Sequence, residues 1–170
     1  MKNLKNYKIE NKKILFRADL NVPVLAGVIQ DTSRIRVIKS SIDKLISNKN
    51  KIFLISHFGR PKGEVVNKYS LHFLIPSLKK IFNLDKVFFL ENLDHSSIEK
   101  IDNEMQGGDL CLFENIRFFK EEESINLNFA RNFCSLFDIY VNDAFSASHR
   151  NHTSITCFPK FLPAVAGNHM

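Results

Sequence analysis

Short apolar segments recur along the chain and are separated by longer stretches with helical periodicity. Segments of this length without polar alternation are typical of strands that are buried on both faces, as in a parallel sheet. We therefore predict five strands, at residues 13–20, 51–57, 86–91, 110–115 and 138–143.

Four segments between these strands have apolar residues at helical spacing: 32–48, 70–82, 95–105 and 127–137. In the first segment the apolar positions fall on one face, with Asp31 or Thr32 as the expected cap. Pro76 is expected to displace the start of the second helix or to kink it. Gly107 and Gly108 are expected to end the third helix.

The alternation of strands and helices predicts right-handed βαβ units and a mostly parallel sheet. The fold expected is a three-layer, Rossmann-like α/β domain with helices on both faces of the sheet. Residues 1–170 contain no internal repeat or low-complexity linker, and we expect them to form one domain. Residues 144–170, which contain Pro159 and Pro163, are expected to be loop-like and to lack a closing helix.

Composition narrows the class of protein. Hydrophobic residues make up 44% of the chain and charged residues 25%, the balance of a soluble globular domain. No apolar run approaches membrane-spanning length, and the first residues lack the apolar stretch of a signal peptide. The three cysteines have no metal-ligand spacing and are expected to be reduced thiols. These features predict a cytoplasmic protein with no membrane partner, and we expect it to be a monomer.

The net charge of +6 raises nucleic acid as a possible partner. The lysines, however, are spread along every segment and are not gathered into one stripe. We therefore expect most of this charge to be solvated surface and expect no nucleic-acid partner. A basic, non-enzymatic RNA-binding module and a stand-alone anion-binding domain remain the alternative hypotheses.

Polar and charged residues follow the predicted strands, where ligands bind in an open parallel sheet. Four of the seven arginines lie in or beside these strand ends. Because the guanidinium group matches phosphate and carboxylate oxygens, the set favours a small, highly charged anion, although each arginine alone is an ordinary surface residue. The strand-end residues are Arg17, Asp19, Asn21, His57, Arg60, Glu114, Asn115, Arg117, Asn142, Asp143, His149, Arg150 and His152.

Arg34 lies in the first turn of the first predicted helix, where it opposes the helix dipole. A bound phosphate or carboxylate would relieve this conflict. The chain lacks both a G-x-x-x-x-G-K-[ST] loop and a G-x-G-x-x-G loop after its first strand. It also lacks a nucleophile elbow and any cluster with metal-ligand spacing. From the residues alone, the sequence predicts an anion-binding α/β domain.

Six segments in this order resemble the signatures of the phosphoglycerate kinase family. Each follows a predicted strand or begins a predicted helix, and the resemblance runs from about Lys13 to Gly167. The segments are 17–23 (RADLNVP), 31–36 (DTSRIR), 56–61 (SHFGRP), 114–118 (ENIRF), 142–145 (NDAF) and 149–152 (HRNH).

The resemblance implies a role for each matching residue. Asp19 and Asn21 would hold the hydroxyl and carboxylate end of 3-phosphoglycerate. Arg34 would be the catalytic residue, nearest the reacting carboxyl oxygen, and would neutralise charge on the phosphoryl group during transfer. The remaining substrate-binding residues would be His57, Phe58, Gly59, Arg60, Arg117 and Arg150, with the arginines and the histidine forming a basic patch.

Other charged residues are given structural roles. Arg17 is expected to pair internally with an acidic neighbour and not to touch substrate. Glu121, Glu122 and Glu123 are expected to form a solvated loop or helix start. Arg36 and Arg131 are expected to be exposed helix residues.

Members of this family continue into a second, carboxy-terminal domain that carries the nucleotide site. The resemblance therefore implies that residues 1–170 are the amino-terminal substrate-binding domain of a two-domain kinase. Mg-ATP or Mg-ADP would be bound by the carboxy-terminal domain, and this chain would contain no cofactor or metal site. The parent enzyme would transfer a phosphoryl group between ATP and 3-phosphoglycerate, and the isolated chain is expected to be inactive.

Overall fold

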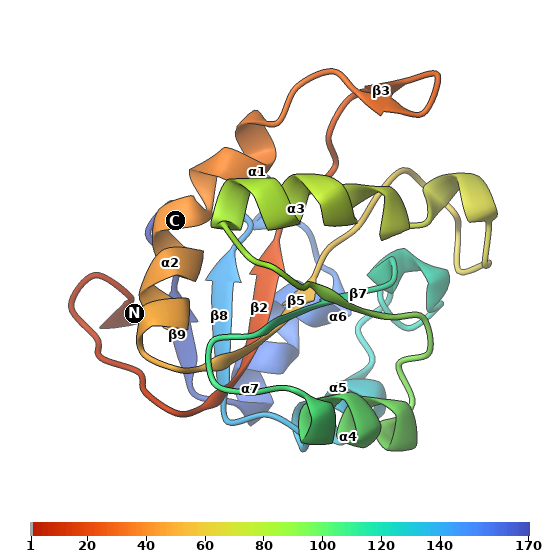
Figure 1. The fold of residues 1–170 in the computed structure, drawn as a ribbon. Helices are drawn as coiled ribbons and strands as arrows, with labels where there is room; N and C mark the ends of the chain where they lie inside the picture. Colours follow the sequence, from red (N-terminus) through yellow and green to blue (C-terminus); the bar gives the residue numbers. More distant parts are fainter. Residues whose placement is uncertain (1) are drawn as a thin grey trace.

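A seven-stranded parallel sheet organises the molecule, as seen in the computed structural model, which describes residues 2–170 (Figure 1). The strand order is β1-β9-β8-β2-β5-β7-β6, and every neighbouring pair is parallel. The strands are β1 (Lys2–Asn3), β2 (Lys13–Ala18), β5 (Lys51–Ile55), β6 (Phe88–Leu90), β7 (Leu110–Phe113), β8 (Ile139–Asp143) and β9 (Ala164–Ala166).

Helices cover both faces of this sheet, which makes the predicted three-layer α/β fold correct. Three helices, α1 (Ser33–Val37), α2 (Lys39–Ser47) and α3 (Ile75–Phe82), lie on one face. The other face is covered by α4 (His95–Glu104), α5 (Leu127–Cys134) and α7 (Phe158–Phe161), with the short helix α6 (Thr153–Thr156) beside them.

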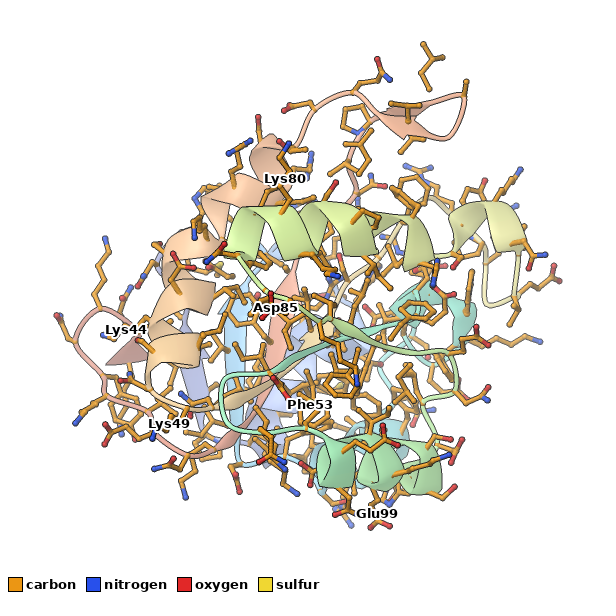
Figure 2. All side chains as sticks on the ribbon, in the orientation of Figure 1. Lys44, Lys49, Phe53, Lys80, Asp85 and Glu99 are labelled. Atoms are coloured by element: carbon orange, nitrogen blue, oxygen red, sulfur yellow. The ribbon has the colours of Figure 1, made fainter. Side chains whose placement is uncertain are left out.

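The hydrophobic core is divided by the sheet into two clusters. In β2, Ile14 and Phe16 face α1, α2 and α3, whereas Leu15 faces the other layer. Phe53 on β5 points into that second layer, where its ring lies 5.2 Å from the ring of Phe137 (Figure 2). Because each central strand buries both faces, it appears in the sequence as a continuous apolar run.

Two predicted helices differ from the sequence pattern. The helix expected over residues 32–48 divides at Ile38, which ends α1 and begins α2 with a ψ angle of −1°. The helix expected over residues 70–82 begins as a 3₁₀ turn, His72–Leu74, and α3 follows with Pro76 in its first turn. A proline is tolerated there because the first amides of a helix have no intrahelical partner.

The prediction of a loop-like carboxyl-terminal stretch is wrong. Residues 144–170 contain a 3₁₀ turn (Phe145–Ala147), α6, α7 and the strand β9, which pairs in parallel with β8 through Val141 and Val165. Pro159 lies in the first turn of α7, and the three-residue strand β9 is too short to produce a periodic signal. A small hairpin of β3 (Val24–Leu25) and β4 (Val28–Ile29) was also not predicted.

Two further sequence predictions bear on the surface and the thiols. Cys111, Cys134 and Cys157 are buried and unpaired, as expected. Among residues 2–170, no helix is both long and apolar enough to cross a membrane. In Figure 2 the labelled Lys44 and Lys49 lie at the α2 side of the molecule, and Lys80 lies on α3.

Candidate functional site

The carboxyl ends of β2, β5, β7 and β8 meet at one edge of the sheet. In the register of the sheet, Arg17 lies opposite Ile55 on one side and Asn142 on the other, and Leu54 lies opposite Leu112. The segments that leave these four strands are therefore neighbours. They contain nearly all the residues predicted to bind substrate; Arg34, at the start of α1, is the exception.

Gly59 lies at the centre of this edge. Its amide donates to Asn21 Oδ1 at 3.1 Å, and its carbonyl accepts from Arg117 Nη1 at 2.7 Å. Its φ angle is +60°, and an added Cβ would lie 2.3 Å from the ring of Tyr69, so only glycine fits. The loop after β5 thereby joins the residues that follow β2 to those that follow β7.

Asn115 holds the same loop from the other side. Its Nδ2 donates to the carbonyl groups of Phe58 and Tyr69, at 2.7 and 2.9 Å. Its Oδ1 accepts from the amides of Phe58 and Arg117, at 3.3 and 3.1 Å. Sequence analysis placed Asn115 at a strand end and gave it no role. The structure shows that this buried amide fixes the backbone on which His57, Phe58 and Gly59 lie.

Asp19 connects the strand end to α1. Its Oδ2 accepts from Arg34 Nη1 and from the Ser146 hydroxyl, and its Oδ1 accepts from the Asn21 amide at 3.0 Å. Burial alone would raise the pKa of Asp19. The hydrogen bonds from Ser146 and Asn21, with the charge of Arg34, outweigh burial and lower the pKa. Asp19 is therefore a carboxylate at neutral pH.

Arg34 occupies the first turn of α1, where the sequence placed it. The helix has no acidic residue in that turn, and its N-cap, Thr32, makes no side-chain cap hydrogen bond. The Asp19 carboxylate takes the place of the anion that the dipole argument called for. The Arg34 side chain remains 43% exposed, so its guanidinium is accessible from solvent.

His57 is 3% exposed and lies among positively charged groups. Burial, and next the charges of Arg17 and Arg117, lower its pKa to about 2, although Asp19 acts in the opposite direction. His57 is therefore neutral at physiological pH. It can serve an anion as a hydrogen-bond donor but not as a charge.

The three arginines of the predicted basic patch differ in burial. Arg117 is 3% exposed, and its Nε is buried without a hydrogen bond, 3.4 Å from Glu123 Oε1. Burial, and next the charge of Arg150, lower the pKa of Arg117. Arg150 is half-buried. Arg60 is exposed and makes no hydrogen bond or ion pair within residues 2–170, so the structure does not bring its guanidinium into the network.

A buried polar network lies beneath the site and corrects one prediction. Glu122 is not solvated: it is 0% exposed and accepts from the amide and hydroxyl of Ser154, at 2.9 and 2.6 Å. Burial raises its pKa, which the charge of Arg17 and the hydrogen bonds from Ser154 partly offset. Arg17 Nη2 lies 3.9 Å from Glu122 Oε1, which makes the predicted internal pairing of Arg17 correct. Arg36 and Arg131 are exposed helix residues, as predicted.

Two cavities adjoin the carboxyl-terminal edge of the sheet. One, of about 420 Å³, is lined by Asp19, Arg34 and Ser146. The larger, of about 580 Å³, includes Glu91, Asp94 and Glu114 in its lining. Both cavities contain carboxylates, with Asp31 and Asp143 also lining the first, and carboxylates have the wrong sign for an anion. The arginines therefore define the candidate site better than either cavity does.

A parallel α/β sheet whose carboxyl-terminal edge gathers arginines and a neutral histidine around one fixed loop has the features expected of an anion-binding α/β domain. Comparison with known proteins identifies the family. The model of the family "Phosphoglycerate kinase" matches residues 4–170, and the chain belongs to the phosphoglycerate kinase family. The resemblance found in the sequence is thereby confirmed.

Individual relatives agree with this assignment. The chain is 44% identical over 165 residues to the phosphoglycerate kinase of Wolbachia pipientis wMel, covering 97% of this chain and 41% of the relative. It is 40% identical over 168 residues to that of Coprothermobacter proteolyticus, covering 98% of this chain and 42% of the relative. The chain thus spans about two fifths of the length of these relatives.

Solved structures show the same fold. The phosphoglycerate kinase of Coxiella burnetii superposes with a TM-score of 0.85 at 31% identity, over 98% of this chain and 41% of that one. The enzyme of Pyrococcus horikoshii superposes with a TM-score of 0.88 at 25% identity, over 100% of this chain and 43% of that one.

Proposed function

We propose that residues 1–170 form the 3-phosphoglycerate-binding half of a phosphoglycerate kinase. The whole enzyme would catalyse reversible phosphoryl transfer between ATP and 3-phosphoglycerate, giving 1,3-bisphosphoglycerate and ADP. The observation that carries this proposal is the network around Gly59, in which Asn21 and Arg117 are held together at the sheet edge. Family membership supplies the substrate, and the geometry supplies groups suited to a small anion with a phosphate at one end.

In this proposal the predicted substrate-binding residues have different roles. Arg117, Arg150 and the exposed Arg60 bind the phosphate and carboxylate charges. Asn21 and Asp19 orient the hydroxyl and carboxylate end: an ionised Asp19 can only accept and takes the hydroxyl, whereas the Asn21 amide can donate to the carboxylate. His57, with Phe58 and Gly59 in the same loop, contributes neutral donors.

Arg34 is the catalytic residue of the proposal. Phosphoryl transfer depends mainly on positioning and on neutralising charge that develops during transfer. Arg34 is accessible, and within residues 2–170 it is paired only with Asp19 and, more weakly, Ser146. Its guanidinium is therefore available to a transferring phosphoryl group at the cost of one ion pair, whose arginine side faces solvent.

The nucleotide belongs to the rest of the enzyme in this proposal. Within residues 2–170 there is no group of three His, Cys, Asp or Glu side chains that could hold a metal ion, and no glycine-rich phosphate loop occurs in the sequence. Mg-ATP or Mg-ADP would bind to the carboxy-terminal domain of the parent enzyme. The chain alone would bind 3-phosphoglycerate without turnover, as a cytoplasmic monomer with no nucleic-acid or membrane partner.

Calorimetric titration tests this proposal. We expect the 170-residue chain to bind 3-phosphoglycerate weakly and ATP hardly at all. Arg117→Gln should weaken 3-phosphoglycerate binding by about tenfold or more, because hydrogen bonds to charged groups are the strong ones. Arg131→Gln removes the same charge from an exposed helix and should leave binding unchanged. Micromolar binding of ATP or of single-stranded RNA, with no response to 3-phosphoglycerate, would refute the proposal.

A further inference from the structure

The contact between Arg17 and His57 determines which ring nitrogen of His57 carries the proton. Arg17 Nη2 lies 3.1 Å from His57 Nδ1, and both side chains are almost fully buried. A guanidinium group has only donors and stays protonated in proteins. His57 Nδ1 must therefore be the acceptor in this hydrogen bond. A neutral imidazole that accepts at Nδ1 carries its proton on Nε2.

The other ring nitrogen of His57, Nε2, is available to a ligand. His57 Nε2 makes no hydrogen bond within residues 2–170, and it does not belong to the buried polar atoms that lack a partner. The small exposed part of this side chain therefore includes Nε2. The charged groups around the ring are Arg17, Arg117, Arg150 and Asp19. An anion drawn to these arginines would meet the N–H of His57.

We propose that Arg17 is a positioning residue that holds His57 in the Nε2–H tautomer, so that His57 presents a neutral N–H donor to the anionic substrate. The opposite tautomer would turn a lone pair toward the anion and repel it. This inference rests on the proposed function, because it takes 3-phosphoglycerate as the ligand. It assigns to Arg17 a role in the site beyond its internal ion pair.

Arg17 is itself held from several directions. Its Nε donates to Ser154 Oγ at 3.1 Å, its Nη1 donates to the Ala18 carbonyl, and Glu122 lies 3.9 Å from its Nη2. Ser154 in turn donates to Glu122 at 2.6 Å. The guanidinium therefore has one orientation, and its contact with His57 is preorganised.

The test compares two variants that differ in whether Arg17, the hydrogen-bond donor to His57, is present. Replacing Arg17 alone would leave Glu122 as a buried, unpaired carboxylate and could unfold the chain. Glu122→Gln removes that charge and keeps Arg17 with its hydrogen bonds to Ser154 and the Ala18 carbonyl, and circular dichroism must first show that this variant folds. The pair Arg17→Met and Glu122→Gln also removes the donor. The ring ¹⁵N chemical shifts of His57 report the tautomer directly. We expect protonated Nε2 and unprotonated Nδ1 in the native chain and in Glu122→Gln, and a mixture of tautomers in the double variant.

Binding of 3-phosphoglycerate separates positioning from simple charge. In the Glu122→Gln background, Arg17→Met should raise the Kd severalfold. When His57→Ala is also present, the same substitution should change the Kd much less, because Arg17 then has no imidazole to orient. An equal loss with and without His57 would overturn the inference and leave Arg17 as a plain charge.

The two proposals fail in different ways. An unchanged His57 tautomer in the double variant would overturn the role of Arg17, even if the native chain binds 3-phosphoglycerate. Native His57 protonated on Nε2 in a chain that does not bind 3-phosphoglycerate would overturn the proposed function and leave the Arg17–His57 contact as a structural one.

Discussion

Replacing Arg34 by alanine in an intact phosphoglycerate kinase that contains this segment should lower kcat by about two to three decades and change the KM for 3-phosphoglycerate little. An interaction that is made mainly in the transition state affects kcat and not KM. Arg34 is placed for such a role, because it is accessible and bound in the free chain chiefly to Asp19. Steady-state kinetics with saturating ATP measure both constants.

Arg36 provides the matched control for Arg34. It lies on the same short helix, is exposed, and within residues 2–170 its Nε donates only to the Thr32 hydroxyl. Arg36→Ala should leave kcat within about twofold, as expected for a surface substitution away from the site. A pure KM effect of Arg34→Ala would make Arg34 a binding residue only.

The stability of the ligand-free chain checks the same assignment. In the ion pair between Arg34 and Asp19 the arginine side chain is 43% exposed and the aspartate side chain 12%, and Asp19 keeps its hydrogen bonds from Ser146 and Asn21 when the arginine is removed. Arg34→Ala should therefore change the free energy of unfolding by about 1 kcal/mol, the upper end for pairs that face solvent. A much larger loss in urea denaturation would show that Arg34 is a structural residue.

Glu122→Ala should lower the free energy of unfolding of the chain by about 3–5 kcal/mol, the largest stability effect that we expect in this structure. The substitution leaves Arg17 as a buried charge without its carboxylate, and it removes the acceptor of two hydrogen bonds from Ser154. Urea denaturation followed by circular dichroism measures the change.

Glu121, in the same run of three glutamates, provides the matched control for Glu122. Glu121 precedes Glu122, and its side chain makes no hydrogen bond or ion pair within residues 2–170. Glu121→Ala should change the free energy of unfolding by less than about 0.5 kcal/mol. The double substitution Glu122→Gln with Arg17→Met should be milder than Glu122→Ala, because no unpaired charge remains. Equal effects at Glu121 and Glu122 would contradict the buried network.

The sheet could be predicted from the sequence because its central strands bury both faces. Each strand is then a continuous apolar run, and strand-end residues follow it at once. The short elements could not be predicted. β9 has three residues, and its stability depends on pairing with β8, which is a tertiary effect. The division at Ile38 leaves the apolar spacing of the helix intact and gives no sequence signal.

The candidate site, like the fold, could be predicted only in part. The positions of Asn21, His57 and Arg117 followed from the strand ends. The structure brings their loops together, and the ligand contacts assigned to them remain predictions. Glu122 was misjudged because nothing in a run of three glutamates marks the middle one as buried. Its partner Ser154 is 32 residues away, and Arg17 is bound to the same serine across 137 residues. Such polar networks depend on contacts that only the folded chain creates.

The location of bound 3-phosphoglycerate on the ¹⁵N-labelled chain, mapped by amide chemical shifts, tests the central claim most directly. We predict that the largest ligand-induced shifts occur at Asn21, Gly59 and Arg117, around the loop that joins three strand ends. The opposite edge of the sheet carries a cavity lined by Lys12 and Lys49, which offers a competing positive surface. Largest shifts around those lysines, with none at Gly59, would contradict the proposed site.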